Sequence, residues 1–216
     1  MKLTVFGASG GTGYQVVSQA LDGGHEVTAV VRDPARLAIS HRSLIVVTAD
    51  VLQPADIADA VAGRDAVISA LGQSRRPQDR KAAANSTLCA DSARSITEAM
   101  RQVGSRRLVI VSSSGPYTDG DGPVLRYVVK PILGRVFKDE YTDLVAMEQV
   151  VRASALDWTV LRPPRLTDKP LTGRYRTRRD ANPARSMRVS RADLAHLALA
   201  TADDPDTYHC AIFIAD

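Results

Sequence analysis

Glycines recur at three-residue intervals near the start of the chain, and they are the first residues whose types and spacing could do chemistry. In VFGASGGTGYQVV, an apolar run precedes these glycines and a helical pattern follows them. A turn between a strand and a helix offers free backbone N–H groups and the positive end of the helix to a phosphate. The context predicts a dinucleotide pyrophosphate site. We assign to it Gly7, Ser9, Gly10, Gly11, Thr12 and Gly13.

The residues after the second expected strand select between the two nicotinamide dinucleotides. An acidic residue there binds the ribose 2′-OH of NAD, whereas arginine suits the 2′-phosphate of NADP. In TAVVRDPARL the strand ends at Val31, Arg32 follows, and Asp33 comes one residue later. Arg36 could close a clamp through the turn set by Pro34. We predict NADP(H) as the cofactor, and the alternative that Asp33 takes the ribose stays open.

The ends of later expected strands extend the same site, because ligands bind at the carboxyl ends of strands in open parallel sheets. Asp50 and Val51 are expected near the adenine. Ala70, Leu71 and Gly72 are expected along the ribose and phosphates. The remaining cofactor residues that we predict from strand ends are Ser112, Pro164 and Arg165.

The elements that position these residues follow from the alternation of short β-rich runs with helical patterns. Apolar strands separated by helices predict a parallel sheet covered on both faces, hence a doubly wound α/β (Rossmann) fold in a single domain, 1–216. Two irregular stretches, 115–138 and 163–188, are candidates for the substrate wall. The expected strands are 2–6, 25–31, 43–50, 65–71, 106–114, 157–164 and 208–215, and the expected helices are 12–21, 55–61, 82–103, 139–154 and 190–201.

Composition and charge narrow the classes of function. Residues 162–191 carry ten Lys or Arg against two Asp, so this segment is +8 in a chain of net charge +4. A basic segment suits an anionic ligand or nucleic acid, but binding of single-stranded nucleic acid usually needs interleaved aromatics and only Tyr175 qualifies. No apolar run approaches the roughly 20 residues of a membrane helix, and no signal peptide is visible. We expect a cytoplasmic monomer or small homo-oligomer with no nucleic-acid or membrane partner.

The two cysteines, Cys89 and Cys210, fit no metal-ligand spacing. We expect both to be ordinary packed thiols and expect no metal site.

Several motifs together resemble the biliverdin-IXβ reductase (flavin reductase) family of atypical short-chain dehydrogenases, which lies near the NmrA-like group. They are FGASGGTG, HEVTAVVRDPARL, DVLQPADIADAVAGRDAVISALG, RPP and PLTGRYR. The resemblance implies an NADPH-dependent reductase that passes hydride to flavins or linear tetrapyrroles. It also implies that Ser113, after the fifth strand, lies near the nicotinamide and the substrate.

Two departures from the patterns of related enzymes bear on mechanism. Arg165 stands where the animal flavin reductase has a histidine after its proline pair, and arginine cannot donate a proton near neutral pH. The Tyr-x-x-x-Lys dyad of ordinary short-chain dehydrogenases is missing, because Glu140 and Leu144 occupy its positions. A flavin, a quinone or another conjugated acceptor can take its proton from water, so the missing dyad favours such an acceptor.

Acceptor binding is expected from the basic segment. We predict contacts from Arg165 and Arg174, with Tyr175 stacking on a ring. The missing dyad equally permits a second hypothesis, a non-catalytic NADP(H)-binding redox sensor of the NmrA type that acts through a protein partner.

Overall fold

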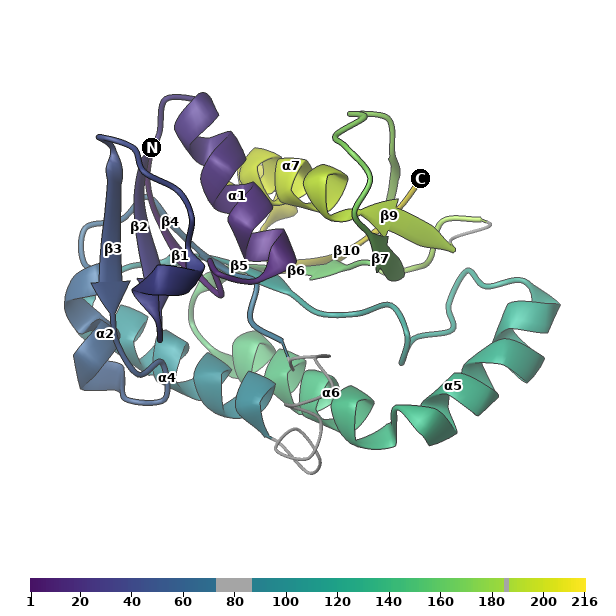
Figure 1. Cartoon of the computed structure of the whole chain (residues 1–216). Coiled ribbons are helices and arrows are strands. Elements are labelled where there is room, and N and C mark those ends of the chain that lie inside the picture. The colour runs from purple at the N-terminus through teal and green to yellow at the C-terminus, as the bar shows by residue number, and fades with distance from the viewer. Residues whose placement is uncertain (73–86, 185–186) are drawn as a thin grey trace.

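An eight-stranded sheet forms the centre of the computed structural model, which describes residues 1–72, 87–184 and 187–216 (Figure 1). The strand order is β3-β2-β1-β4-β5-β6-β10-β8, and every pairing is parallel except that of β10 with the edge strand β8. The order reverses beside β1, which is where open α/β sheets bind ligands. The bounds are β1 Lys2–Phe6, β2 Glu26–Val31, β3 Leu44–Thr48, β4 Ala66–Ser69, β5 Arg107–Val111, β6 Asp157–Arg162, β8 Arg176–Arg179 and β10 Cys210–Ala215.

Helices cover both faces of the sheet, as Figure 1 shows. One face packs against α1 (Gly11–Asp22) and α7 (Arg191–Ala202), and the other packs against α2 (Pro54–Val61), α4 (Leu88–Val103) and α6 (Lys138–Ala153). Each layer has its own apolar cluster, one around Val16 and Leu194 and the other around Ile96 and Met147. Because strands buried on both faces must be apolar throughout, the sequence pattern led to the right architecture. The predicted doubly wound fold is confirmed.

The third expected strand is present as β3, but its exposure differs from the expectation of a sheet covered on both faces. β3 is an edge strand, and the side chains of Ile45 and Val46 are 59% and 39% exposed. An apolar run predicts a strand, but its place at the edge of the sheet depends on which strand pairs beside it.

The two stretches expected to be irregular contain regular elements. Within 115–138 the chain forms a π-helical turn, η3 (Leu125–Val129), that continues into α5 (Lys130–Val136). Within 163–188 it forms β7 (Arg165–Thr167) and β8, and β7 pairs in parallel with β9 (Arg188–Ser190) as a small second sheet. Short elements of this kind form through pairing partners that are remote in sequence. For the helix expected at 82–103, residues 82–86 lie outside the described part of the chain.

Both cysteines are buried. Burial raises the pKa of the Cys89 thiol, and the nearby Asp143 carboxylate raises it further. Burial also raises the pKa of Cys210. These shifts disfavour the thiolate, so both residues behave as packed thiols. Among the described residues, no helix has the length and apolar character needed to cross a membrane.

Candidate cofactor and acceptor site

The backbone of the glycine loop between β1 and α1 packs closely on itself and on the residue that follows β4. Gly7 has a φ of +75°, a left-handed conformation that favours glycine, and a β-carbon there would lie 2.7 Å from the Ala70 carbonyl oxygen. A β-carbon on Gly13 would collide with the Gly7 carbonyl oxygen. Gly10 donates its N–H to the same oxygen at 2.9 Å. The turn is therefore compact enough for a phosphate to approach its backbone.

The N-terminus of α1 is suited to an anion. Gly10 is its N-cap and has no side chain with which to cap the helix, and the first turn holds no acidic residue. The side chain of Arg191, from the first turn of α7, lies across this end. A β-carbon on Gly11 would be 2.7 Å from Arg191 Cδ and 2.9 Å from its Nε. Arg191 also pairs with the exposed Asp168 at 2.5 Å. A cation beside the positive end of a helix is unfavourable until an anion joins it.

In the segment after β2, the side chains of Arg32 and Asp33 have different surroundings. The Asp33 carboxylate caps the short helix η1 (Pro34–Arg36), because Oδ1 accepts the Ala35 N–H at 3.1 Å. Arg32 and Arg36 are both exposed. The capping contact engages the acidic group that would otherwise compete for the ribose, and it leaves the two arginines facing solvent at the end of β2.

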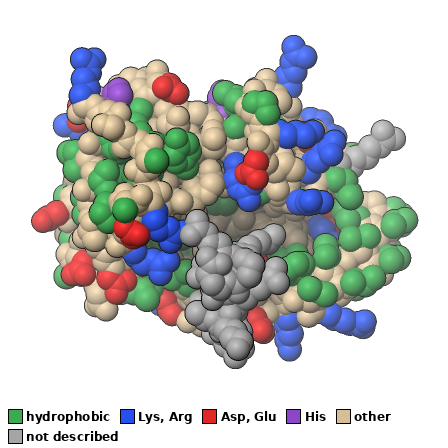
Figure 2. Space-filling view, viewed as in Figure 1, with side chains coloured by type: hydrophobic (Ala, Val, Ile, Leu, Met, Phe, Trp, Pro, Cys, Tyr) green, Lys and Arg blue, Asp and Glu red, His purple; other side chains and the backbone are tan. Residues whose placement is uncertain are grey.

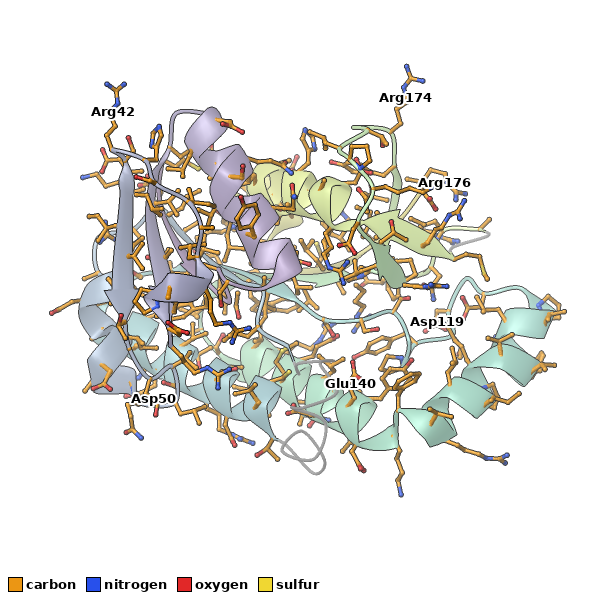
Figure 3. All side chains as sticks on the ribbon, in the orientation of Figure 1. Arg42, Asp50, Asp119, Glu140, Arg174 and Arg176 are labelled. Carbon is orange, nitrogen blue, oxygen red and sulfur yellow. The ribbon has the colours of Figure 1, made fainter. Side chains whose placement is uncertain are left out.

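The residues that follow β3 and β4 lie at the carboxyl ends of these strands. Asp50 lies beyond the carboxyl end of β3 (Figure 3), where its Oδ1 accepts the Leu52 N–H at 3.0 Å. Val51 is buried. Ala70 donates its N–H to the Phe6 carbonyl at 3.0 Å, so the end of β4 adjoins the glycine turn. Leu71 and Gly72 continue from there and are more exposed.

The first two of the three serines after β5 have different surroundings. The Ser112 hydroxyl is buried and donates to Glu148 Oε1 at 2.6 Å. This corrects the expectation of a cofactor contact from that side chain, because the hydroxyl is turned into the protein. Ser113 is half-buried at the surface of the site, where its Oγ accepts the Gly115 N–H at 3.1 Å. Ser113 is the serine that remains available to a ligand.

Beneath these serines lies a buried ionic network. Glu148 accepts hydrogen bonds from Ser112 and from Arg162 Nε, the latter at 3.0 Å. The Arg162 guanidinium lies 3.3 Å from the centre of the Tyr117 ring. Burial, followed by the nearby Glu148 carboxylate, raises the pKa of Tyr117 to about 12. The network joins β5, β6 and α6 at the carboxyl edge of the sheet, and its tyrosine stays protonated.

A cavity of about 600 Å³ opens beside Gly115, between the segment after β5, α5 and α6. Figure 2 shows the molecule hollowed in this region. The Tyr141 hydroxyl lies so close over Gly115 that a β-carbon on that glycine would collide with it. Lys130 reaches inward from α5 to Asp121 at 2.5 Å and donates to the Ser114 carbonyl at 3.1 Å. Burial lowers the pKa of Lys130, and Asp121 partly offsets this effect.

The residues predicted to hold the acceptor are not brought together. Arg165 follows β6 at the carboxyl edge and is exposed, with the half-buried Pro164 before it. Arg174 extends away from the molecule, on the side opposite to Asp50 and Glu140 (Figure 3). The Tyr175 hydroxyl is 2.7 Å from His196 Nδ1, on α7. The structure therefore corrects the prediction for Arg174, which extends away from the molecule, and for Tyr175, which contacts α7.

The PLTG motif has a structural explanation. Asp193, in the first turn of α7, accepts the N–H groups of Thr172 and Gly173, both at 2.9 Å, and the Ser190 hydroxyl at 2.7 Å. Ser190 also caps α7, because its Oγ accepts the Asp193 N–H at 2.9 Å. The motif fastens the loop that carries Arg174 onto α7.

Sequence reasoning missed three residues of this site. Arg191 and Tyr141 approach the site from helices distant in the chain, and Glu148 lies under it. The helical spacing of Tyr141, Leu144 and Glu148 marks one face of a helix, but nothing in that spacing shows what the face contacts. Within the described ranges, no group of three or more His, Cys, Asp or Glu is placed to hold a metal.

The fold and the glycine turn define a class, the Rossmann-fold proteins that bind nicotinamide dinucleotides. The model of the NAD(P)H-binding family matches residues 7–205, and the chain belongs to this family. The predicted nicotinamide cofactor is confirmed at this level, and the glycine turn and the anion-suited end of α1 fit it.

Relatives with known sequences or structures agree with the fold. The Bacillus subtilis protein YwnB is 24% identical, over 95% of this chain and 94% of its own length. A wide-type short-chain dehydrogenase/reductase from Veillonella parvula, solved with NADP, superimposes with a TM-score of 0.82 at 19% identity, covering 100% and 94% of the two chains. The oxidoreductase YlbE from Lactococcus lactis gives 0.78 at 16% identity, covering 100% and 91%.

Proposed function

We propose that this protein is an NADPH-dependent reductase that passes hydride to a conjugated acceptor such as a flavin or a quinone. The observation that carries the proposal is an open cavity lined by Gly115 and Tyr141, in a chain whose sequence has no Tyr-x-x-x-Lys dyad. Membership of the NAD(P)H-binding family indicates a nicotinamide cofactor. Two proteins with the same fold as this chain are described as an oxidoreductase and a dehydrogenase/reductase.

The preference for NADPH rests on the segment after β2. Asp33 is engaged as a helix cap, whereas Arg32 and Arg36 face solvent where the adenosine ribose lies in this fold. Arginine binds a phosphate through charge-assisted hydrogen bonds, so these two residues favour the 2′-phosphate.

The protein's own residues position the acceptor. Leu144, at the position of the lysine in ordinary short-chain dehydrogenases, is buried and apolar. Tyr141 lines the cavity, and Ser113 accepts the N–H of Gly115, which also lines it, so both hydroxyls lie near Gly115. When bound, the reduced nicotinamide supplies the hydride. An acceptor whose negative charge spreads over a ring takes its proton from water, so positioning supplies most of the catalysis. The balance is NADPH, a proton and the acceptor giving NADP⁺ and the two-electron-reduced acceptor.

The test is the loss of absorbance at the NADPH band with FMN and with a water-soluble quinone, run in parallel with NADH. We expect turnover that requires an acceptor and is faster with NADPH. A simple ketone or aldehyde series serves as the control, because an alkoxide product needs a positioned acid and the Tyr-x-x-x-Lys dyad that supplies it in ordinary short-chain dehydrogenases is missing from the sequence. Turnover with ketones but with neither conjugated acceptor would contradict the proposal.

The redox-sensor hypothesis is the second candidate, and the replaced dyad positions favour it. It predicts calorimetric binding of NADP⁺ with no reduction of any acceptor. Binding without turnover over the whole acceptor series would replace the reductase proposal with this one.

A further inference from the structure

The segment η3–α5 presents an unusual surface to solvent. Five large apolar side chains recur on it at helical spacing with exposed fractions of 53–71%: Val124, Tyr127, Val128, Ile132 and Val136. We call this set the apolar α5 face. Figure 2 shows hydrophobic side chains gathered at the right-hand end of the molecule, where Figure 1 places α5. Contiguous exposed apolar patches usually mark an interaction site.

The charged residues near the apolar α5 face indicate which kind of partner could cover it. Residues 122–138 contain four Lys or Arg and no Asp or Glu. Lys130 is buried against Asp121, whereas Arg126, Arg135 and Lys138 are exposed. Arg126 and Lys138 also line the cavity, and Arg135 does not. The nearest exposed acidic residue along the chain is Asp139, just beyond the segment. The surface is therefore apolar at its centre and positively charged at its margin.

We propose that the apolar α5 face docks onto an anionic lipid surface. Apolar residues on one side of a short helix, with cations around them, enter the boundary between headgroups and acyl chains, and the cations add attraction to anionic lipids. Tyr127 suits that boundary because its ring is apolar and its hydroxyl is polar. A two-fold dimer through this face would bring like cations of the two copies together, which disfavours a second copy as the partner.

The cavity lies next to the proposed docking surface, which links docking to the proposed reaction. Arg126, Lys130, Pro131 and Gly134 of the same segment line the cavity beside Gly115. The apolar α5 face and the cavity wall are thus two sides of one helix. A docked molecule would hold the cavity close to the lipid, within reach of a lipophilic conjugated acceptor such as a membrane quinone. This consequence rests on the proposed reductase function, whereas the docking does not.

The experiment is co-sedimentation of the full chain with phosphatidylcholine vesicles, with and without phosphatidylglycerol, at low and high salt. We expect binding that requires the anionic lipid and weakens with salt. Ile132→Glu should abolish it. The matched control is Ile45→Glu, at an isoleucine that is 59% exposed, against 55% for Ile132, but lies on the edge strand β3. Because both side chains are exposed, both variants should melt like the wild type.

A second pair of variants tests the cations. Arg135→Gln should weaken vesicle binding about fivefold, which corresponds to one cation near an anionic surface. Arg42→Gln, at an exposed arginine on the far side of the molecule in Figure 3, should leave binding unchanged. Failure to sediment with anionic vesicles at low salt, or equal effects of Ile132→Glu and Ile45→Glu, would overturn the proposal. So would a dimer, seen by light scattering, that Ile132→Glu disrupts without any vesicle binding.

Activity provides a separate readout. With docking intact, we expect faster reduction of a vesicle-dissolved quinone than of the same quinone ring without its lipid tail. Lipid binding without reduction of any acceptor would contradict the reductase function and leave the docking proposal standing.

Discussion

At the scale of single residues, the proposed preference for NADPH depends on Arg32. Its exposed side chain follows β2, and the neighbouring Asp33 carboxylate accepts the Ala35 N–H. We therefore expect discrimination between the cofactors to come from an exposed cation next to an anion that caps a helix.

We expect Arg32→Ala to raise the Kd for NADP⁺ about 10- to 100-fold, through loss of a charge-assisted contact to the 2′-phosphate. The Kd for NAD⁺, which lacks that phosphate, should change little. Calorimetric titration of both cofactors measures the ratio. Arg42→Ala, at an exposed arginine elsewhere, is the control. An equal loss for both cofactors would mean that Arg32 does not read the 2′-phosphate.

Arg191 should act on the other phosphates. Its side chain lies across the N-terminus of α1, so Arg191→Met should weaken NADP⁺ and NAD⁺ by the same factor, about 10-fold, and leave their ratio unchanged. Asp168→Asn should instead tighten both, because it removes the carboxylate that competes for Arg191. If Asp168→Asn weakens binding, the pair has a purely structural role.

A substitution at Tyr141 tests whether the proton for the proposed reduction comes from water. If the proton comes from water, Tyr141→Phe should lower kcat for FMN by less than about tenfold, since a positioned acid usually contributes 10²- to 10⁴-fold. An increase in KM is compatible with lost positioning near Gly115. A fall in kcat of about a thousandfold would identify Tyr141 as the acid and contradict the solvent-proton mechanism.

At the scale of elements, the junction between α7 and the 170–173 loop depends on Asp193. Burial alone would raise the pKa of this carboxyl, but hydrogen bonds from Ser190, Thr172 and Gly173 outweigh burial and lower it. A carboxyl with a depressed folded-state pKa stabilises the fold above its unfolded-state pKa. That contribution is lost as pH falls through the folded-state value.

Asp193→Asn should lower the free energy of unfolding by about 1–3 kcal/mol near neutral pH. The difference from wild type should shrink below pH of about 4, where the unfolded carboxyl protonates. Urea unfolding at a series of pH values measures it. Thr172→Val, which keeps the carboxylate and the backbone donors, should have a smaller effect. A difference that stays constant down to acid pH would exclude the titration of Asp193 as its source.

At the scale of the whole molecule, a buried arginine links several elements at the amino ends of the strands, opposite to the site. Arg107, at the start of β5, donates to the carbonyls of Thr201 and Asp157 at 2.5 and 2.7 Å, and to the Thr207 hydroxyl at 3.0 Å. Burial lowers its pKa. These bonds join the end of α7, β6 and the η4 turn (Pro205–Thr207).

We expect Arg107→Met to cost about 3 kcal/mol, because several buried acceptors lose their donor. Thermal unfolding should show a Tm lower by about 10 °C for a chain of this size. NADP⁺ affinity should be retained, because the cofactor residues lie at the other edge. The neighbouring Arg106→Met removes an exposed pair with Asp157 and should cost under about 1 kcal/mol. Equal losses for the two variants would contradict this account.

The sequence by itself determined the doubly wound parallel sheet, the glycine turn and the places of Arg32 and Asp50 at strand ends. These depend on local backbone sterics, on apolar periodicity and on strand ends that parallel pairing collects at one edge. Only the tertiary structure decided that Ser112 turns inward to Glu148, that Arg191 crosses α1, that Tyr175 contacts α7 and that α5 is helical with an apolar outer face. Each of these depends on what packs against a side chain from a distant part of the chain, which the spacing of residues does not encode.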